Sequence, residues 1–153
     1  MKLILRPPDN LKPVKLTPGN IYSTTHLAFL TNPTELARAK GTVNFSYPVI
    51  VDEVEYADVE EAFQLIKRSS RYLEPEERFE LSAYLIRLKL DRYPFIPNSI
   101  SLSGGVKFLE QCNHLGGRSS MWTGHGRESG FIRCLIRAFE TWTLGIPIEQ
   151  PQF

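Results

Sequence analysis

An apolar helix near the carboxyl end most constrains what this chain can fold into. Between about Glu128 and Trp142, apolar residues recur at intervals of three and four. They form two adjoining rows, Phe131, Leu135, Ala138 and Trp142 in one and Ile132, Ile136 and Phe139 in the other. A helix with so wide an apolar face is stable in water mainly because other parts of the chain cover it. We therefore expect this helix to be packed into a core and to end before Gly145.

Two helix-start patterns lie in the first half of the chain. Asn32 as N-cap, a proline in the first helical position and Glu35 predict a short helix over about 33–40. Asp58 followed by Glu61 predicts a second, longer helix with its own capping box. The apolar residues of that helix recur at helical spacing and should face the core: Val59, Ala62, Phe63 and Ile66.

Further helices are expected between these two regions. A third begins near Pro75 and runs to about Asp91, because Pro94 and Pro97 interrupt the next stretch of the chain. Ser103 is expected to cap a fourth, whose apolar positions are Val106, Phe108, Leu109 and Cys112.

Strand-like sequence is confined to short segments. The β-branched residues of 47–56 predict two strands that turn at Asp52-Glu53. The first 31 residues are rich in proline and should form an extended arm, with an edge strand over Lys2 to Leu5. The sequence thus predicts one α+β domain over 1–153, predominantly helical, with a small β-hairpin or sheet.

Composition narrows the class of protein. The 18 basic and 17 acidic residues leave a formal charge of +1, which argues against a constitutive nucleic-acid coat. No apolar run approaches the ~20 residues that span a bilayer, and no secretory leader is apparent, so we expect a soluble cytoplasmic protein without membrane contact. Cys112, His114, His125 and Cys134 lack the paired spacing of a zinc site, so neither metal nor cofactor is expected.

Glu60 is the most informative polar position. It lies in the first turn after Asp58, where the helix dipole favours an ionised carboxylate, and Gln64 and Lys67 come next on the same face. Periodicity alone leaves two readings open, a solvated helix face or an anion at the mouth of a pocket. The segment 118–127 leaves a similar choice. Its glycines, Trp122, Arg118 and Arg127 suit a nucleotide-binding loop, and they equally suit a surface loop whose tryptophan fills the core.

A resemblance to a known family bears on both choices. The segment from Asn44-Phe45 through Asp52, and then the helix carrying Glu60, Phe63-Gln64 and Lys67, is similar to the signature of the NADAR (YbiA-like) family. The loop around Trp122 and the helix after it resemble that family's tryptophan-glycine loop and final helix.

The resemblance implies an N-glycosidase that hydrolyses a ribosyl C1–N bond. The substrate classes it implies are ribosylamino-pyrimidine phosphates and ADP-ribose attached to guanine, free or in DNA. Breaking that bond builds positive charge on the sugar, which a fixed carboxylate stabilises. The resemblance thereby implies Glu60, Gln64 and Lys67 as catalytic residues. Asn44, Phe45 and Trp122 would bind the substrate, with Arg118 and Arg127 at its phosphates.

Two positions depart from the family pattern, and they leave other functions open. Glu61 stands where the family commonly has histidine, and Ser129-Gly130 stands roughly where it has Asn-x-Leu-Gly. The alternative is a non-catalytic protein that sequesters an ADP-ribose-derived signalling nucleotide. A third hypothesis is an adaptor whose aromatic-rich helices serve a partner protein.

Overall fold

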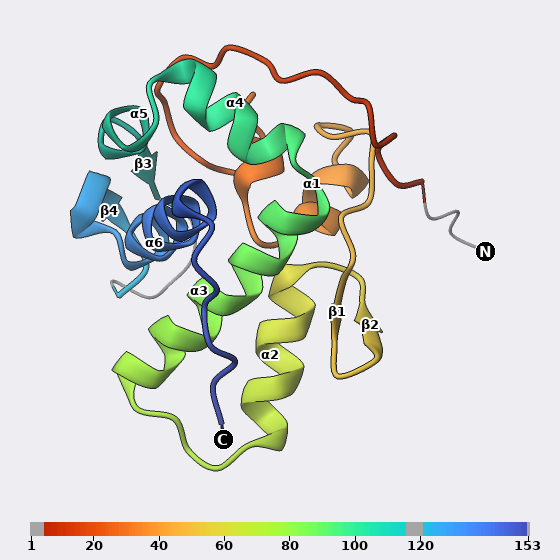
Figure 1. The fold of residues 1–153 in the computed structure, drawn as a ribbon, viewed down its shortest axis with the longest axis vertical. Helices are drawn as coiled ribbons and strands as arrows, with labels where there is room; N and C mark the ends of the chain where they lie inside the picture. The colour runs from red at the N-terminus through yellow and green to blue at the C-terminus, as the bar shows by residue number, and fades with distance from the viewer. Residues whose placement is uncertain (1–4, 116–120, 153) are drawn as a thin grey trace.

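Two long helices form the centre of the fold. In the computed structural model, which describes residues 5–115 and 121–152, α3 (Pro75–Arg92) and α6 (Gly130–Leu144) cross and pack together (Figure 1). Their apolar faces meet through fully buried side chains that include Leu85, Ile132 and Leu135. The predicted helix near the carboxyl end is confirmed. It starts at Gly130 because the preceding residues form a 3₁₀ turn, η2 (Gly126–Glu128).

α2 (Val59–Ser69) starts directly after Asp58, as predicted, and packs against α3. The Asp58 carboxylate accepts hydrogen bonds from the backbone N–H of Glu61 at 2.8 Å and from that of Glu35 at 3.0 Å. Glu35 belongs to another helix, α1 (Thr34–Ala39). One buried carboxylate therefore caps two helices, and it fixes α1 beside the start of α2.

The predicted N-cap of α1 is wrong. Pro33 occupies the cap position, and the side chain of Asn32 makes no cap hydrogen bond. Since Asp58 already accepts from the N–H of Glu35, the donor that an Asn32 cap needs is taken. The Asn32 side-chain oxygen is buried without a hydrogen-bond partner among the described residues.

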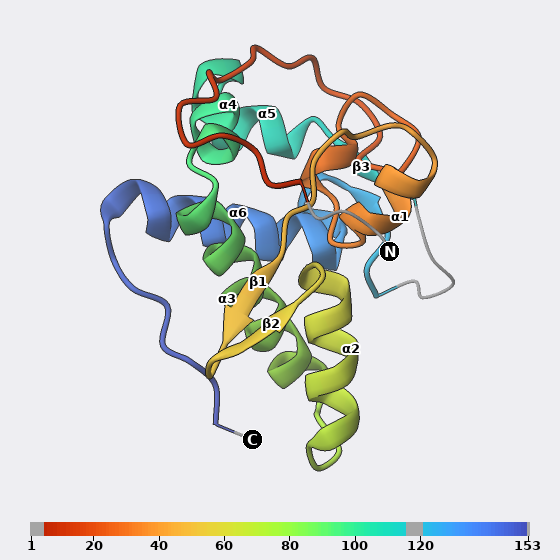
Figure 2. The same ribbon diagram turned by 90° about the vertical axis from the view of Figure 1, so that its right-hand side faces the viewer.

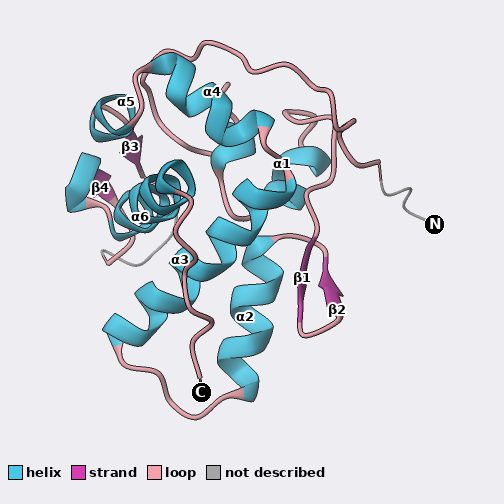
Figure 3. Ribbon diagram, in the orientation of Figure 1, coloured by secondary structure: helices cyan, strands magenta, loops and turns pink. Residues whose placement is uncertain are grey.

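The strand prediction over 47–56 is confirmed as an antiparallel hairpin of β1 (Val49–Val51) and β2 (Val54–Tyr56), drawn in magenta in Figure 3. Asp52 and Glu53 join the strands with φ of 49° and 67°, the left-handed geometry that a two-residue type I′ turn requires. The hairpin lies beside α2 and in front of α3 (Figure 2).

The arm that precedes α1 is extended but firmly attached. It runs over α4 (Phe95–Ser103), where the backbone N–H groups of Val14 and Leu16 donate to the hydroxyls of Ser99 and Ser103 (Figure 2). It then enters a short 3₁₀ helix, η1 (Ala28–Leu30). Of the predicted edge strand, residues 2–4 lie outside the described residues. Leu5 is not in a strand, although its carbonyl accepts from Ser46 N–H.

α4 is a helix that the sequence does not predict, since prolines such as Pro94 and Pro97 ordinarily interrupt helices. Pro97 lies in the first turn of α4, where a backbone N–H has no helical acceptor to lose. Ser103 is the last residue of α4 and not the cap of the next helix, α5 (Val106–Glu110), which begins after Gly105.

A second small antiparallel pair, β3 (Asn113–His114) and β4 (Gly124–His125), completes an α+β fold dominated by helices. Among residues 5–115 and 121–152, no helix combines the length and apolar character needed to cross a membrane.

Candidate functional site

A cavity of about 680 Å³ opens beside α2 and α3. Its volume is in the range of small-molecule sites in proteins. Its wall combines aromatic and other apolar side chains with amide, hydroxyl and charged groups: Tyr22, Ser23, Thr31, Asn32, Pro33, Leu36, Glu60, Phe63, Gln64, Lys67, Arg78, Ser82, His114, Met121, Trp122 and Phe131. Glu60 and Trp122, far apart in the sequence, thus lie on the same cavity.

α2 supplies the polar face of the wall. The Gln64 side-chain Nε2 donates to Glu60 Oε1 at 2.8 Å, which fixes the orientation of the carboxylate. Glu60 is half-buried in the first turn of the helix, where the dipole favours negative charge. One turn beyond Gln64, the Lys67 Nζ lies 5.3 Å from the centre of the Phe63 ring. The helical register therefore brings an anion, an amide and a cation to one side of the cavity.

Trp122 forms an aromatic wall and also fills space in the core. Its ring packs edge-on against Phe63 and Phe79, with centroids 5.8 and 5.0 Å apart. Its backbone carbonyl accepts from the Ser129 hydroxyl at 2.6 Å, at the cap of α6. The two readings of this tryptophan are therefore not exclusive, because one face of the side chain packs inward while the residue still lines the cavity.

Gly130 allows this close approach. It is the first residue of α6, and its N–H donates to the Met121 carbonyl at 3.2 Å. A β-carbon at position 130 would overlap that carbonyl oxygen and the Phe79 ring. Only glycine lets residues 121–122 lie against the start of α6.

His114 lines the cavity, whereas the sequence analysis considered it only as a candidate metal ligand. Its Nδ1 donates to the Ile21 carbonyl at 2.9 Å, and its ring packs on Phe131 with centroids 4.5 Å apart. Burial lowers the pKa of His114, and the Ile21 carbonyl and the charge of Glu60 only partly oppose this. At neutral pH the ring is therefore uncharged with its proton on Nδ1, and Nε2 is a hydrogen-bond acceptor.

α3 contributes two further wall residues that were not foreseen, Arg78 and Ser82. They are four residues apart and so share one face of the helix. Their spacing in the sequence indicates a shared helix face. It does not show which arginine of α3 faces the cavity, because that depends on how α2 packs against α3.

Three of the predicted substrate-binding residues lie away from the cavity, and a fourth lies outside the described residues. Asn44 is exposed and Phe45 packs against the hydrophobic core, so neither borders it. Arg127 is exposed in η2, where its Nε pairs with Glu110 Oε2 at 2.9 Å. Arg118 lies outside the described residues.

Next to the cavity, Asp58 and Lys89 form a buried polar junction. Lys89 is 2% exposed, and its Nζ donates to the carbonyls of Phe29 and Thr31 at 2.7 and 2.8 Å. Burial lowers the pKa of Lys89 to about 7, although the charge of Asp58 opposes the shift. Burial raises the pKa of Asp58, against its two backbone hydrogen bonds and the charge of Lys89. The junction holds the chain at Thr31 and Asn32, which belong to the cavity wall.

Within the described stretches of the chain, no three His, Cys, Asp or Glu side chains are grouped so as to hold a metal ion. Cys112 and Cys134 are both buried thiols, and burial raises the pKa of each. No protein-family model matches this chain, and no curated protein or solved structure is significantly similar to it.

Proposed function

We propose that this protein is a NADAR-like N-glycosidase, which hydrolyses the C1–N bond of an ADP-ribose-like or ribosylamino-pyrimidine nucleotide. One observation carries the proposal. Four of the eight site residues predicted from the sequence, Glu60, Gln64, Lys67 and Trp122, line a single cavity of nucleotide-compatible size.

The proposed reaction is hydrolytic and needs only water as co-reactant. The C1–N bond breaks, its electron pair leaves with the base nitrogen, and that nitrogen takes up a proton. The sugar passes through an oxocarbenium-like state, which the Glu60 carboxylate stabilises from close range. The oxygen of water then bonds to C1, and its proton leaves by way of Glu60 to solvent.

The surroundings of Glu60 suit this role. Gln64 occupies one carboxylate oxygen, and Oε2 makes no hydrogen bond among the described residues. The Trp122 and Phe63 rings offer apolar surface to a base. His114 Nε2 would accept a hydrogen bond from a hydroxyl or N–H of the ligand.

The test measures released base by liquid chromatography and mass spectrometry. The purified protein is incubated with ADP-ribosylated guanine in DNA, NAD-derived nucleotides and ribosylamino-pyrimidine phosphates. With an active substrate, we expect Glu60→Gln to slow release by about 100- to 10,000-fold.

Glu61→Gln is the matched control. It removes a carboxylate from the same helical turn, but Glu61 is exposed and does not line the cavity. No release from any of these substrates, or full activity of Glu60→Gln, would contradict the proposal. A nucleotide recovered intact after heat denaturation, with no turnover, would instead identify the sequestering protein.

A further inference from the structure

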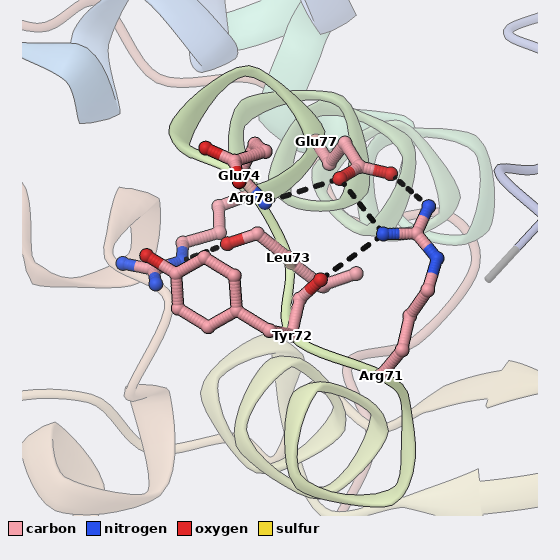
Figure 4. A network of polar contacts seen from close by, with 6 residues as sticks. All are labelled: Arg71, Tyr72, Leu73, Glu74, Glu77 and Arg78. Atoms are coloured by element: carbon pink, nitrogen blue, oxygen red, sulfur yellow. Dashed lines mark hydrogen bonds and ion pairs between the residues drawn. The ribbon is translucent and has the colours of Figure 1, made fainter.

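Two cations from neighbouring helices face the same cavity. Lys67 comes from α2 and Arg78 from α3, and the two helices pack side by side. Neither makes an ion pair with a carboxylate among the described residues. Arg71, in the loop that joins the same helices, provides the contrast. Its guanidinium is bound by both carboxylate oxygens of Glu77 (Figure 4).

Aromatic rings and a carbonyl hold the two cations in place. The Arg78 guanidinium lies 5.2 Å from the centre of the Tyr72 ring, and its Nε donates to the Leu73 carbonyl at 3.0 Å. Figure 4 shows the terminal nitrogens of Arg78 beside that ring, without the dashed contacts that Arg71 makes. Lys67 is similarly placed over Phe63. A ring face attracts a cation but leaves its N–H groups able to bind an anion.

The charge of the wall is uneven. Among the described lining residues, Glu60 is the single carboxylate, whereas Lys67 and Arg78 are both cations. Glu60 precedes Lys67 by seven residues, a rise of about 10.5 Å along the helix. The cavity therefore has an anionic group near one end of α2 and two cationic groups toward the other.

We infer that Lys67 and Arg78 form the subsite that binds the phosphate of this cavity's ligand, several bonds from the atom that Glu60 faces. The inference rests on the proposed function for the sugar at Glu60, but the subsite itself does not require catalysis. The planar fork of arginine binds two phosphate oxygens at once, and lysine adds a compact charge for a third.

A phosphate monoester and a diphosphate share this chemistry, and binding measurements separate them. Calorimetric titrations would use ribose 5-phosphate and ADP-ribose, with ribose and adenosine as unphosphorylated counterparts. We expect ribose 5-phosphate to bind at least tenfold more tightly than ribose if a monoester suffices. If a diphosphate is needed, only ADP-ribose will exceed adenosine by that factor.

The variants Lys67→Gln and Arg78→Gln should each weaken binding of the phosphorylated probe by about 10- to 100-fold, as expected for one charge-assisted contact. Arg68→Gln is the matched control, since it removes a cation from the neighbouring position of α2, outside the cavity. If Arg78→Gln fails to fold, Arg78→Lys and Lys67→Gln provide the test, and Arg78→Lys should lose less affinity than Arg78→Gln.

Equal binding of phosphorylated and unphosphorylated probes by the wild-type protein would overturn the inference. So would an Arg68→Gln variant as weak as Lys67→Gln. Failure of the proposed function is a separate result. Glu60→Gln should still bind the phosphorylated probe, so phosphate-dependent binding without base release would keep the subsite and reject the glycosidase.

Discussion

Two sets of charges lie on α2 and beside it, and they are bonded in different ways. In the buried junction, Asp58 accepts from two backbone N–H groups and Lys89 donates to two backbone carbonyls. In the cavity wall, Glu60 is bonded to one amide and Lys67 lies against a ring, and both side chains are half-buried. Only one residue, Val59, separates Asp58 from Glu60. Carboxylates and lysines thus serve the structure where backbone groups bind them, and are available to a ligand where they have fewer hydrogen-bond partners.

The largest effect on stability is expected when a charge is removed from the buried junction. Asp58→Ala deletes the caps of α1 and α2 and removes the negative charge that acts on buried Lys89. We expect the free energy of unfolding to fall by about 2–4 kcal/mol in urea denaturation, since each cap contributes about 1–2 kcal/mol. Glu55→Ala, which breaks the exposed pair with Arg6, should cost less than about 1 kcal/mol.

A double mutant measures the coupling between Asp58 and Lys89. If Asp58 and Lys89 stabilise each other, Lys89→Met should be less destabilising in the Asp58→Ala background than in the wild-type protein. A loss below about 1 kcal/mol for Asp58→Ala alone, no greater than an exposed pair is worth, would show that the junction does not hold the two helices.

A smaller effect on stability is expected from pH at His114, in the cavity wall. The folded state lowers the pKa of His114 below the ordinary value of 6.5, so between these two values the unfolded chain binds more protons than the folded one. The neutral His114 ring therefore contributes fully to the free energy of unfolding above pH 6.5. This contribution is lost as the pH falls from 6.5 through the pKa of the folded state. In His114→Gln, the decline of the melting temperature below pH 6.5 should be shallower. An identical pH profile in both proteins would contradict the neutral ring.

The smallest effect on stability is expected at the catalytic candidate itself. Glu60→Gln keeps the side-chain size and removes a half-exposed charge, so the free energy of unfolding should change by less than about 1 kcal/mol. Urea denaturation of this variant beside Asp58→Ala measures the difference directly. Equal losses would place Glu60 in the structural junction and remove the distinction between the two regions.

Local patterns in the sequence were sufficient for the parts of the site that lie on one helix. The cap at Asp58 fixes the start of α2, and helical spacing then puts Glu60, Gln64 and Lys67 on one face. The hairpin at Asp52 was also readable from its flanking strands, even without glycine in the turn.

Features that depend on distant segments were not predictable in this way. The Asn32 cap failed because the N–H of Glu35 donates instead to Asp58, which lies 23 residues further along the chain. Arg78 and His114 reach the cavity only through the packing of α2, α3 and the arm, which no local periodicity encodes.

The glycine at position 130 has a consequence for how the cavity meets its ligand. Trp122 is tied to the start of α6 through its carbonyl, and no side chain at 130 separates the two segments. The aromatic wall is therefore ordered before a ligand binds, and ligand binding loses little conformational entropy in ordering Trp122. Such preorganisation favours discrimination by shape, since a rigid wall does not adjust to a misfitting ring.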